Sequence, residues 1–220
     1  MGSITRSFAN NIGSSGILTA SAVTNTTVED VTSFDNAASS ATLVLLSTQT
    51  ASASANISFT TGLDSTYDEY IFKFIDIHPA TDDVLFQFNM STDSGSNYNV
   101  TKTTTAFRVR HDEADTATAL EYRTSEDLAQ STGFQSLTTG QGNDADQNSS
   151  GTLTLFNPSS TTYVKHFISR LNEYHEGNVS IETNTAGYGN TTSAVNAIQF
   201  KFSSGNIDDG IIKLYGVKKS

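Results

Sequence analysis

The chain has no cysteine, no tryptophan and only two prolines among its 220 residues. Without cysteine it can form neither a disulfide nor a thiolate metal site, so its stability must come from packing or from association of several copies. Lysine and arginine number 12 against 23 acidic residues, which gives a formal net charge of -11. Nucleic-acid binding relies on basic side chains that displace phosphate counterions, so the sequence predicts no nucleic-acid partner.

Long hydrophobic runs are also missing. The longest, LVLL at residues 43–46, is far shorter than the roughly 20 apolar residues that a membrane-spanning helix needs. The first residues lack the basic-then-apolar order of a signal peptide. The sequence therefore predicts neither membrane insertion nor a cleaved leader.

Enzyme and metal-site motifs are likewise absent: there is no Gly-x-Ser-x-Gly elbow, no Walker loop and no HExxH. Residues 144–148 begin like an EF-hand loop, but Ser149 replaces the required glycine and Leu155 the required glutamate. The HDEAD cluster at 111–115 could offer oxygen ligands to calcium, although a solvated acidic turn is the simpler interpretation. We predict a non-enzymatic chain with no catalytic residues, no cofactor and no metal.

Two weaker alternatives concern catalysis. Adjacent carboxylates such as Asp82 and Asp83 could act as acid and base in a glycosidase, but neighbouring side chains on a strand or turn usually point apart. His166 lies between Val164 and Ile168 in an alternating stretch, so we expect a core or interface histidine there. An enzyme remains the third and weakest hypothesis.

What the sequence does have is alternation of apolar and polar residues. Residues 84–90 place Val, Phe, Phe and Met on one face, the pattern of a half-buried strand. Residues 70–77 are apolar on both faces, with Ile77 on the same face as Ile75, which predicts a strand between two layers. Residues 78–83 have the Pro and Asp content of a turn. The simplest prediction is a hairpin.

Similar alternating segments recur after residue 42, separated by turn signals such as Asn-Pro-Ser-Ser at 157–160. Only residues 120–130 resemble a short helix. The sequence thus predicts an all-β, jelly-roll-like sandwich over residues 43–220. The predicted strands are 43–47, 56–60, 69–77, 84–90, 104–110, 152–156, 163–170, 179–183, 197–203 and 211–217.

Residues 1–42 are rich in small polar residues and carry only scattered apolar ones. Such a segment buries too little apolar area to order itself, so we predict an extended N-terminal docking arm. Its candidate anchoring residues are Ile4, Phe8 and Ile12.

Possible contact residues lie outside the alternating segments. The polar interval 112–151 is longer than a hairpin needs, which is typical of a functional loop or a subunit contact, and we expect Arg108 and Arg110 on the exposed side of the strand before it. Exposed tyrosines in polar loops can stack on sugar rings, and oligomer interfaces also favour tyrosine. The candidates for glycan or interface contacts are Tyr98, Tyr122, Tyr174 and Tyr188.

Several whole segments resemble virion structural proteins from tailed phages of marine bacteria, including those that infect cyanobacteria and pelagic bacteria. They are SITRSFANNI at 3–12, LLSTQTASASANISFTTGLDSTYDEYIFKFIDIHPATD at 45–82, FNPSSTTYVKHFI at 156–168 and SSGNIDDGIIKLYGVK at 203–218. Together these segments span most of the chain, from residue 3 to residue 218, and none is a catalytic signature. The resemblance implies a protein located in the virion, with the arm docked on the tail or capsid and the β-sandwich displayed outward.

The resemblance does not separate a tail fibre, a tail-hub attachment and a capsid decoration. We expect a structural component that contacts other virion proteins and forms a homo-oligomer, with a trimer favoured because trimers of long viral β modules hide strand edges. The alternative is a receptor-binding module that recognises host surface glycans through the 112–151 interval and its neighbouring tyrosines.

Overall fold

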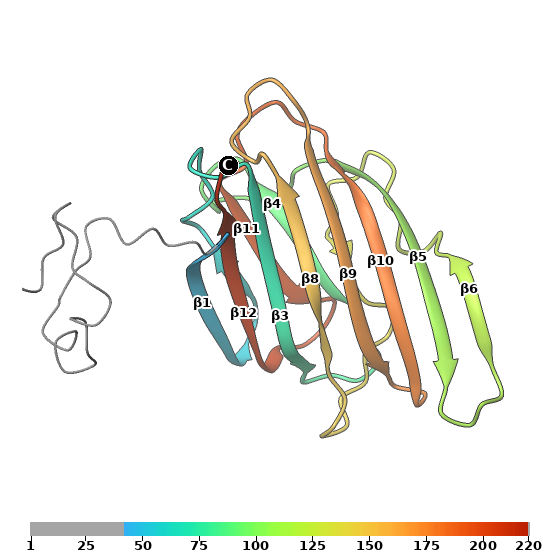
Figure 1. Cartoon of the computed structure of the whole chain (residues 1–220). Helices are drawn as coiled ribbons and strands as arrows, with labels where there is room; N and C mark the ends of the chain where they lie inside the picture. The colour runs from blue at the N-terminus through green and yellow to red at the C-terminus, as the bar shows by residue number, and fades with distance from the viewer. Residues whose placement is uncertain (1–41, 220) are drawn as a thin grey trace, which may run out of the picture. The chain divides into compact units, whose positions relative to one another are not determined.

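The computed structural model of the chain describes residues 42–219. These residues contain no helix, and so none that could cross a membrane. Twelve strands form two antiparallel sheets that pack as a sandwich, which confirms the predicted fold class (Figure 1). The strands are β1 Leu43–Ser54, β2 Ile57–Phe59, β3 Glu69–Pro79, β4 Phe86–Ser91, β5 Lys102–Asp112, β6 Thr118–Tyr122, β7 Gln135–Ser136, β8 Ser149–Phe156, β9 Lys165–His175, β10 Val179–Gly189, β11 Ala197–Phe202 and β12 Ile207–Val217.

The two sheets are unequal. The larger has the order β1-β12-β3-β8-β9-β10-β5-β6, and the smaller has the order β2-β11-β4-β7. All ten strands predicted from alternation are present, while β6 and β7 were missed. The helix predicted over residues 120–130 is wrong: its first residues belong to β6, whose alternating exposure follows a strand period.

The predicted hairpin is also wrong. β3 pairs with β12 and β8 in the large sheet, whereas β4 pairs with β11 and β7 in the small one. The turn between β3 and β4 therefore carries the chain from one sheet to the other. The apolar side chains of the two strands meet across the sandwich, so their alternation predicts the shared core but not the pairing.

The core between the sheets is aromatic. The predicted buried face of residues 84–90 is confirmed, since Phe86, Phe88 and Met90 have no exposed surface. Phe74 of β3 lies edge-on to Phe86 at 5.3 Å between ring centroids. Edge-to-face contacts of this kind add to the hydrophobic stabilisation of burial.

The outer face of β3 is only half-buried, so the expected layer on both sides of this strand is not found among residues 42–219. Ile71 and Ile75 lie on this outer face. Ile77 instead points into the core, because a bulge at Asp76, whose φ is 51°, shifts the register after Phe74. The apolar character of β3 on two faces partly reflects this bulge.

One stretch of the 112–151 interval is buried. Residues 135–142 are all buried, and Leu137 donates its backbone N–H to the Phe86 carbonyl at 2.7 Å. Gln141 exchanges two backbone hydrogen bonds with Val84. This part of the interval covers the inner face of the large sheet beside β4, whereas other parts of the interval, such as Leu120 and Tyr122 of β6 and residues 129–130 and 132–133, are exposed.

Candidate functional site

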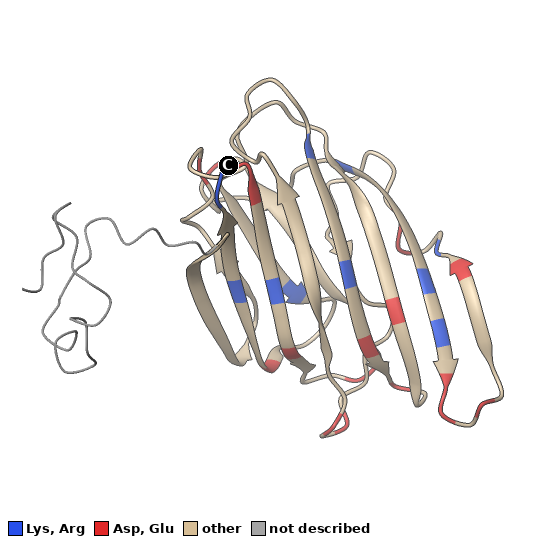
Figure 2. Cartoon of the chain, viewed as in Figure 1, with Lys and Arg blue, Asp and Glu red and all other residues tan. Residues whose placement is uncertain are grey.

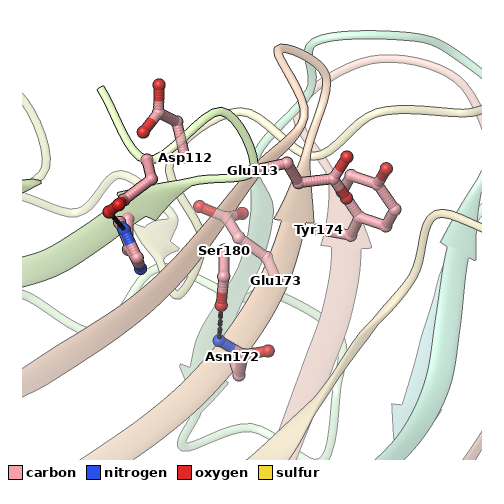
Figure 3. A pocket seen from close by; sticks show the side chains of 8 residues that line it. Asp112, Glu113, Asn172, Glu173, Tyr174 and Ser180 are labelled. Carbon is pink, nitrogen blue, oxygen red and sulfur yellow. Dashed lines mark hydrogen bonds and ion pairs between the residues drawn. The ribbon is translucent and has the colours of Figure 1, made fainter. Parts of the chain in front are cut away.

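A cavity of about 430 Å³ lies at the end of the large sheet where β5 and β9 finish and β10 begins (Figure 3). We call it the tip cavity. Its walls come from the turn after β5, from the outer side of β9 and from the start of β10. The residues that line it are His111, Asp112, Glu113, Asp115, Asn172, Glu173, Tyr174 and Ser180.

The turn after β5 is built by Asp112. One carboxylate oxygen accepts the backbone N–H groups of Thr116 and Ala117 at 2.8 Å each, and the other accepts the Thr116 hydroxyl. These hydrogen bonds, led by that of the Thr116 side chain, lower the pKa of Asp112 to about 2. Glu113 then donates its backbone N–H to the Asn178 carbonyl at 3.1 Å, which joins this turn to the one between β9 and β10.

The carboxylates of residues 112 and 115, which the calcium alternative would use as ligands, have partners within the turn. Both carboxylate oxygens of Asp112 are engaged in the turn, and the Asp115 carboxylate contacts the Nε2 of His111 at 3.0 Å. Within residues 42–219 no group of three histidine or carboxylate side chains is placed to hold a metal ion.

The tip cavity carries an aromatic ring among hydrogen-bonding groups. Figure 3 shows the side chains of Glu113 and Tyr174 pointing toward each other, and the hydrogen bond with Glu113 raises the pKa of the Tyr174 phenol. The Asn172 amide donates to the Ser180 hydroxyl at 3.1 Å. A ring beside an amide, a hydroxyl and a carboxylate can stack on a sugar and bond its hydroxyls.

A buried polar layer lies beneath this end of the sheet. Glu173 is 1% exposed, and its carboxylate accepts the Thr139 N–H at 2.8 Å and the Thr139 hydroxyl at 2.6 Å. Burial raises the pKa of Glu173 to about 7. Arg108 donates to Thr139 at 3.0 Å and pairs with Glu121 at 3.3 Å.

Further along β5, Lys102 has no exposed surface, and its ammonium lies 2.5 Å from the Asn89 side-chain oxygen and 2.9 Å from the Val100 carbonyl. Burial lowers the pKa of Lys102 to about 7. The polar layer thus extends beneath much of β5, and it fixes the loops that cover the inner face of the sheet.

The expected exposed placement is therefore wrong for Arg108, whereas the Arg110 side chain is 40% exposed. Arg108 is 9% exposed on the inner face, and Arg110 follows it on the same side with its Nε 3.3 Å from Glu121. The outward positions of β5 belong instead to Phe107 and Val109. The alternation in KTTTAFRVRH separates the two faces of this strand. Expecting charged residues to face water leads to the wrong choice of which face is buried.

The outer face of β9, β10, β5 and β6 is a second candidate surface, which we call the outer face. It contains a groove of about 440 Å³ whose floor lies at Ala186 and Gly187. The rings of His166 and Tyr188 lie 6.0 Å apart beside it. His166 is exposed, so its expected place in the core is wrong, while its interface role stays a prediction.

The structure brings three of the four candidate tyrosines onto this outer face: Tyr122, Tyr174 and Tyr188. They do not form one cluster, because Tyr174 and Tyr188 stand at opposite ends of the paired strands β9 and β10, about 26 Å apart at the usual rise of a strand. Tyr98 lies elsewhere, half-buried beside Gly95. The candidate anchoring residues Ile4, Phe8 and Ile12 lie outside the described residues.

Comparisons of the chain with protein-family models, with curated proteins and with solved structures find no match.

Proposed function

We propose that the chain is a non-enzymatic structural protein of a tailed-phage virion, attached to the tail or capsid through residues 1–42 and displaying its β-sandwich outward. Its partners would be other virion proteins and further copies of itself, with assembly in the host cytoplasm. The resemblance of the quoted segments supports location in a virion. The arrangement of the two ends of the large sheet supports outward display of the sandwich.

The main observation behind the proposal is that the first strand begins at one end of the large sheet and the tip cavity lies at the other. Leu43 pairs with Val217 at one end of the large sheet, so the chain begins its first strand there. The tip cavity lies at the other end, where Asp112 and His175 both pair with Val179. Figure 1 shows β5 and β9 ending on this side of the large sheet. Strands of eleven residues separate the two ends by about 36 Å. An attachment through the preceding residues would therefore leave the tip free.

Replacing Ile4, Phe8 and Ile12 together by serine is expected to remove the protein from particles of the phage that carries this gene. Burial of three apolar side chains in a docking site would contribute several kcal/mol, so occupancy should fall by at least about tenfold. Quantitative mass spectrometry of purified particles, scaled to the major capsid protein, measures the effect.

The matched control changes polar residues of the same segment, Asn10→Ser and Asn11→Ser, and should leave occupancy unchanged. Wild-type occupancy of the apolar triple variant would show that these residues are not the anchor. Absence of the wild-type protein from particles would refute the virion role itself.

Recognition of host surface glycans is the second candidate function, and the tip cavity favours it. Tyr174 offers a ring, while Glu113, Asn172 and Ser180 offer acceptors and donors at the end of the sheet remote from Leu43. Hydrogen-bonding groups that converge around an aromatic ring are typical of ligand sites. Under this hypothesis the same protein would attach the particle to its host.

If the tip cavity binds glycans, Tyr174→Ala is expected to abolish binding of the purified chain to a glycan array, because it removes the stacking surface. Asn172→Ala should weaken binding about tenfold through loss of one or two hydrogen bonds. Tyr98→Ala, which removes a half-buried tyrosine outside the cavity, serves as the control. Binding that survives Tyr174→Ala but is lost in Tyr122→Ala would move the site to β6, and no binding by the wild-type chain would leave only the structural role.

A further inference from the structure

We propose that the outer face of β9, β10, β5 and β6 is a contact surface for a second copy of this chain. The contact goes beyond the proposed place in a virion, because it would be a property of the purified chain alone. It centres on five exposed apolar side chains, which we call the outer patch: Phe107, Val109, Leu120, Tyr122 and Ile168.

Four of the five side chains of the outer patch are neighbours, and Ile168 lies on β9, separated from β5 by β10. Phe107 stands directly opposite Tyr122 and Val109 directly opposite Leu120 in the β5–β6 ladder, so these four side chains form one block. Leu120 is 72% exposed, Ile168 56% and Tyr122 54%. Monomeric proteins rarely leave a contiguous apolar surface of this kind in water.

The pattern of β5 is reversed from that of a sheet whose outer side faces water. Such a strand turns apolar side chains inward and polar ones outward. β5 turns Lys102 and Arg108 inward, with 0% and 9% exposure, and turns Phe107 and Val109 outward. Hydrogen bonds offset the free-energy cost of burying Lys102 and Arg108. A partner that covers Phe107 and Val109 would remove the cost of exposing them to water.

Charge favours a second copy as that partner. Two chains of net charge -11 repel each other, and many of their acidic residues lie in the turns at the tip end (Figure 2). The outward positions of β9, β10, β5 and β6 carry one carboxylate, Glu182, and one Lys or Arg side chain, Arg170. These two pair with each other at 2.7 Å, so the face is neutral in itself. Two acidic copies can approach here with little repulsion.

The area also fits. Four strands spaced by about 4.8 Å, three of eleven residues and one of five, present a face of roughly 600 Å² at 3.3 Å per residue. A standard interface buries about 800 Å² on each partner, so this face and its rim suffice for a stable contact. A monosaccharide would cover only part of the patch. A face that packs on its own copy closes at two chains, whereas the predicted trimer would require this face to meet a different surface of the next copy.

The test uses the purified full-length chain. Sedimentation velocity at chain concentrations from 1 to about 100 µM is expected to show self-association of the wild type. The double variant Phe107→Glu/Leu120→Glu should weaken this association at least about 100-fold, because two carboxylates would be buried in the contact without a partner of opposite charge. The matched control is Leu45→Glu, which places a charge on the same side of the same sheet at a 52% exposed position on the opposite edge strand β1. Association should be unchanged in this control.

Each substitution is at an exposed position, so we expect all variants to fold. Circular dichroism and thermal melting check this. A single Val109→Cys in a chain without cysteine provides an independent measurement. A short bifunctional maleimide should join two Val109→Cys chains and leave Leu45→Cys chains unjoined.

Three outcomes would overturn the proposal. A chain that stays monomeric with a freely reactive cysteine at Val109 has no partner copy on this face. A monomer in which that cysteine is protected has the patch covered by its own residues 1–41. An oligomer that persists in the Phe107→Glu/Leu120→Glu variant assembles through another surface. These results are independent of particle occupancy, so failure here is distinguishable from failure of the virion role.

Discussion

Replacing Phe200 by alanine is expected to lower the free energy of unfolding by about 4 kcal/mol, within the range for large-to-small substitutions of a buried Phe. Phe200 of β11 has no exposed surface and lies at the centre of the aromatic core. Its ring centroid is within 6.4 Å of five others, those of Phe59, Phe72, Phe74, Phe86 and Phe88. Because these rings come from both sheets, the cavity would lie where the sheets meet.

Urea unfolding followed by circular dichroism measures this loss, which is a large part of the roughly 5–15 kcal/mol that holds a typical domain together. Phe107→Ala removes the same side chain from an exposed position and should change stability by less than about 0.5 kcal/mol at concentrations that keep the chain monomeric. Similar losses in the two variants would mean that the aromatic core is not the main source of stability.

Replacing Glu173 by glutamine is expected to change how stability depends on pH. The pKa of Glu173 is raised by burial from 4.5 to about 7 in the folded chain. A raised pKa means that its contribution is fully present below about pH 4.5 and is lost as the pH rises to about 7, by up to about 3 kcal/mol. Glu173→Gln cannot ionise, so it should gain stability relative to the wild type across this window.

The measurement is the difference in unfolding free energy between Glu173→Gln and wild type from pH 4.5 to 8, because the difference removes the contributions of the other titrating groups. Glu176→Gln, which replaces an exposed carboxylate three residues later, is the control for removal of one negative charge from this end of the sheet. Parallel curves for Glu173→Gln and wild type would contradict the pKa assigned to this carboxyl group.

Alternation was sufficient to predict the strands because it depends on local burial. It could not predict which strands pair, since Tyr70, Phe72 and Phe74 present the same pattern whether β4 lies beside them or across the core. The bulge at Asp76 was hidden for a related reason: a one-residue shift of register leaves no mark in composition. β6 was missed because three of its five residues are exposed, so its pattern resembled a helix as much as a strand.

The candidate sites were harder to predict than the fold. The sequence identifies Tyr174 as a candidate but not its neighbours Asn172 and Ser180, which come together through the pairing of β9 with β10. The inward direction of Arg108 depends on Thr139 and Glu121, which approach it from a covering loop and from the edge strand. Such contacts depend on how the strands and loops are arranged in space. Local patterns in one sequence do not show that arrangement.

The meeting of Leu43 and Val217 at one end of the large sheet makes the sandwich suitable as a carrier for inserted peptides. Thr42 and Lys218 lie together at this same end, where the Lys218 N–H donates to the Thr42 carbonyl at 2.9 Å. The β9–β10 turn at Gly177 stands at the opposite end and is exposed, and a side chain added at this glycine would make only ordinary van der Waals contacts with His175 and Val179. A foreign epitope placed in this turn would be carried about one strand length from the attachment side without interrupting either sheet.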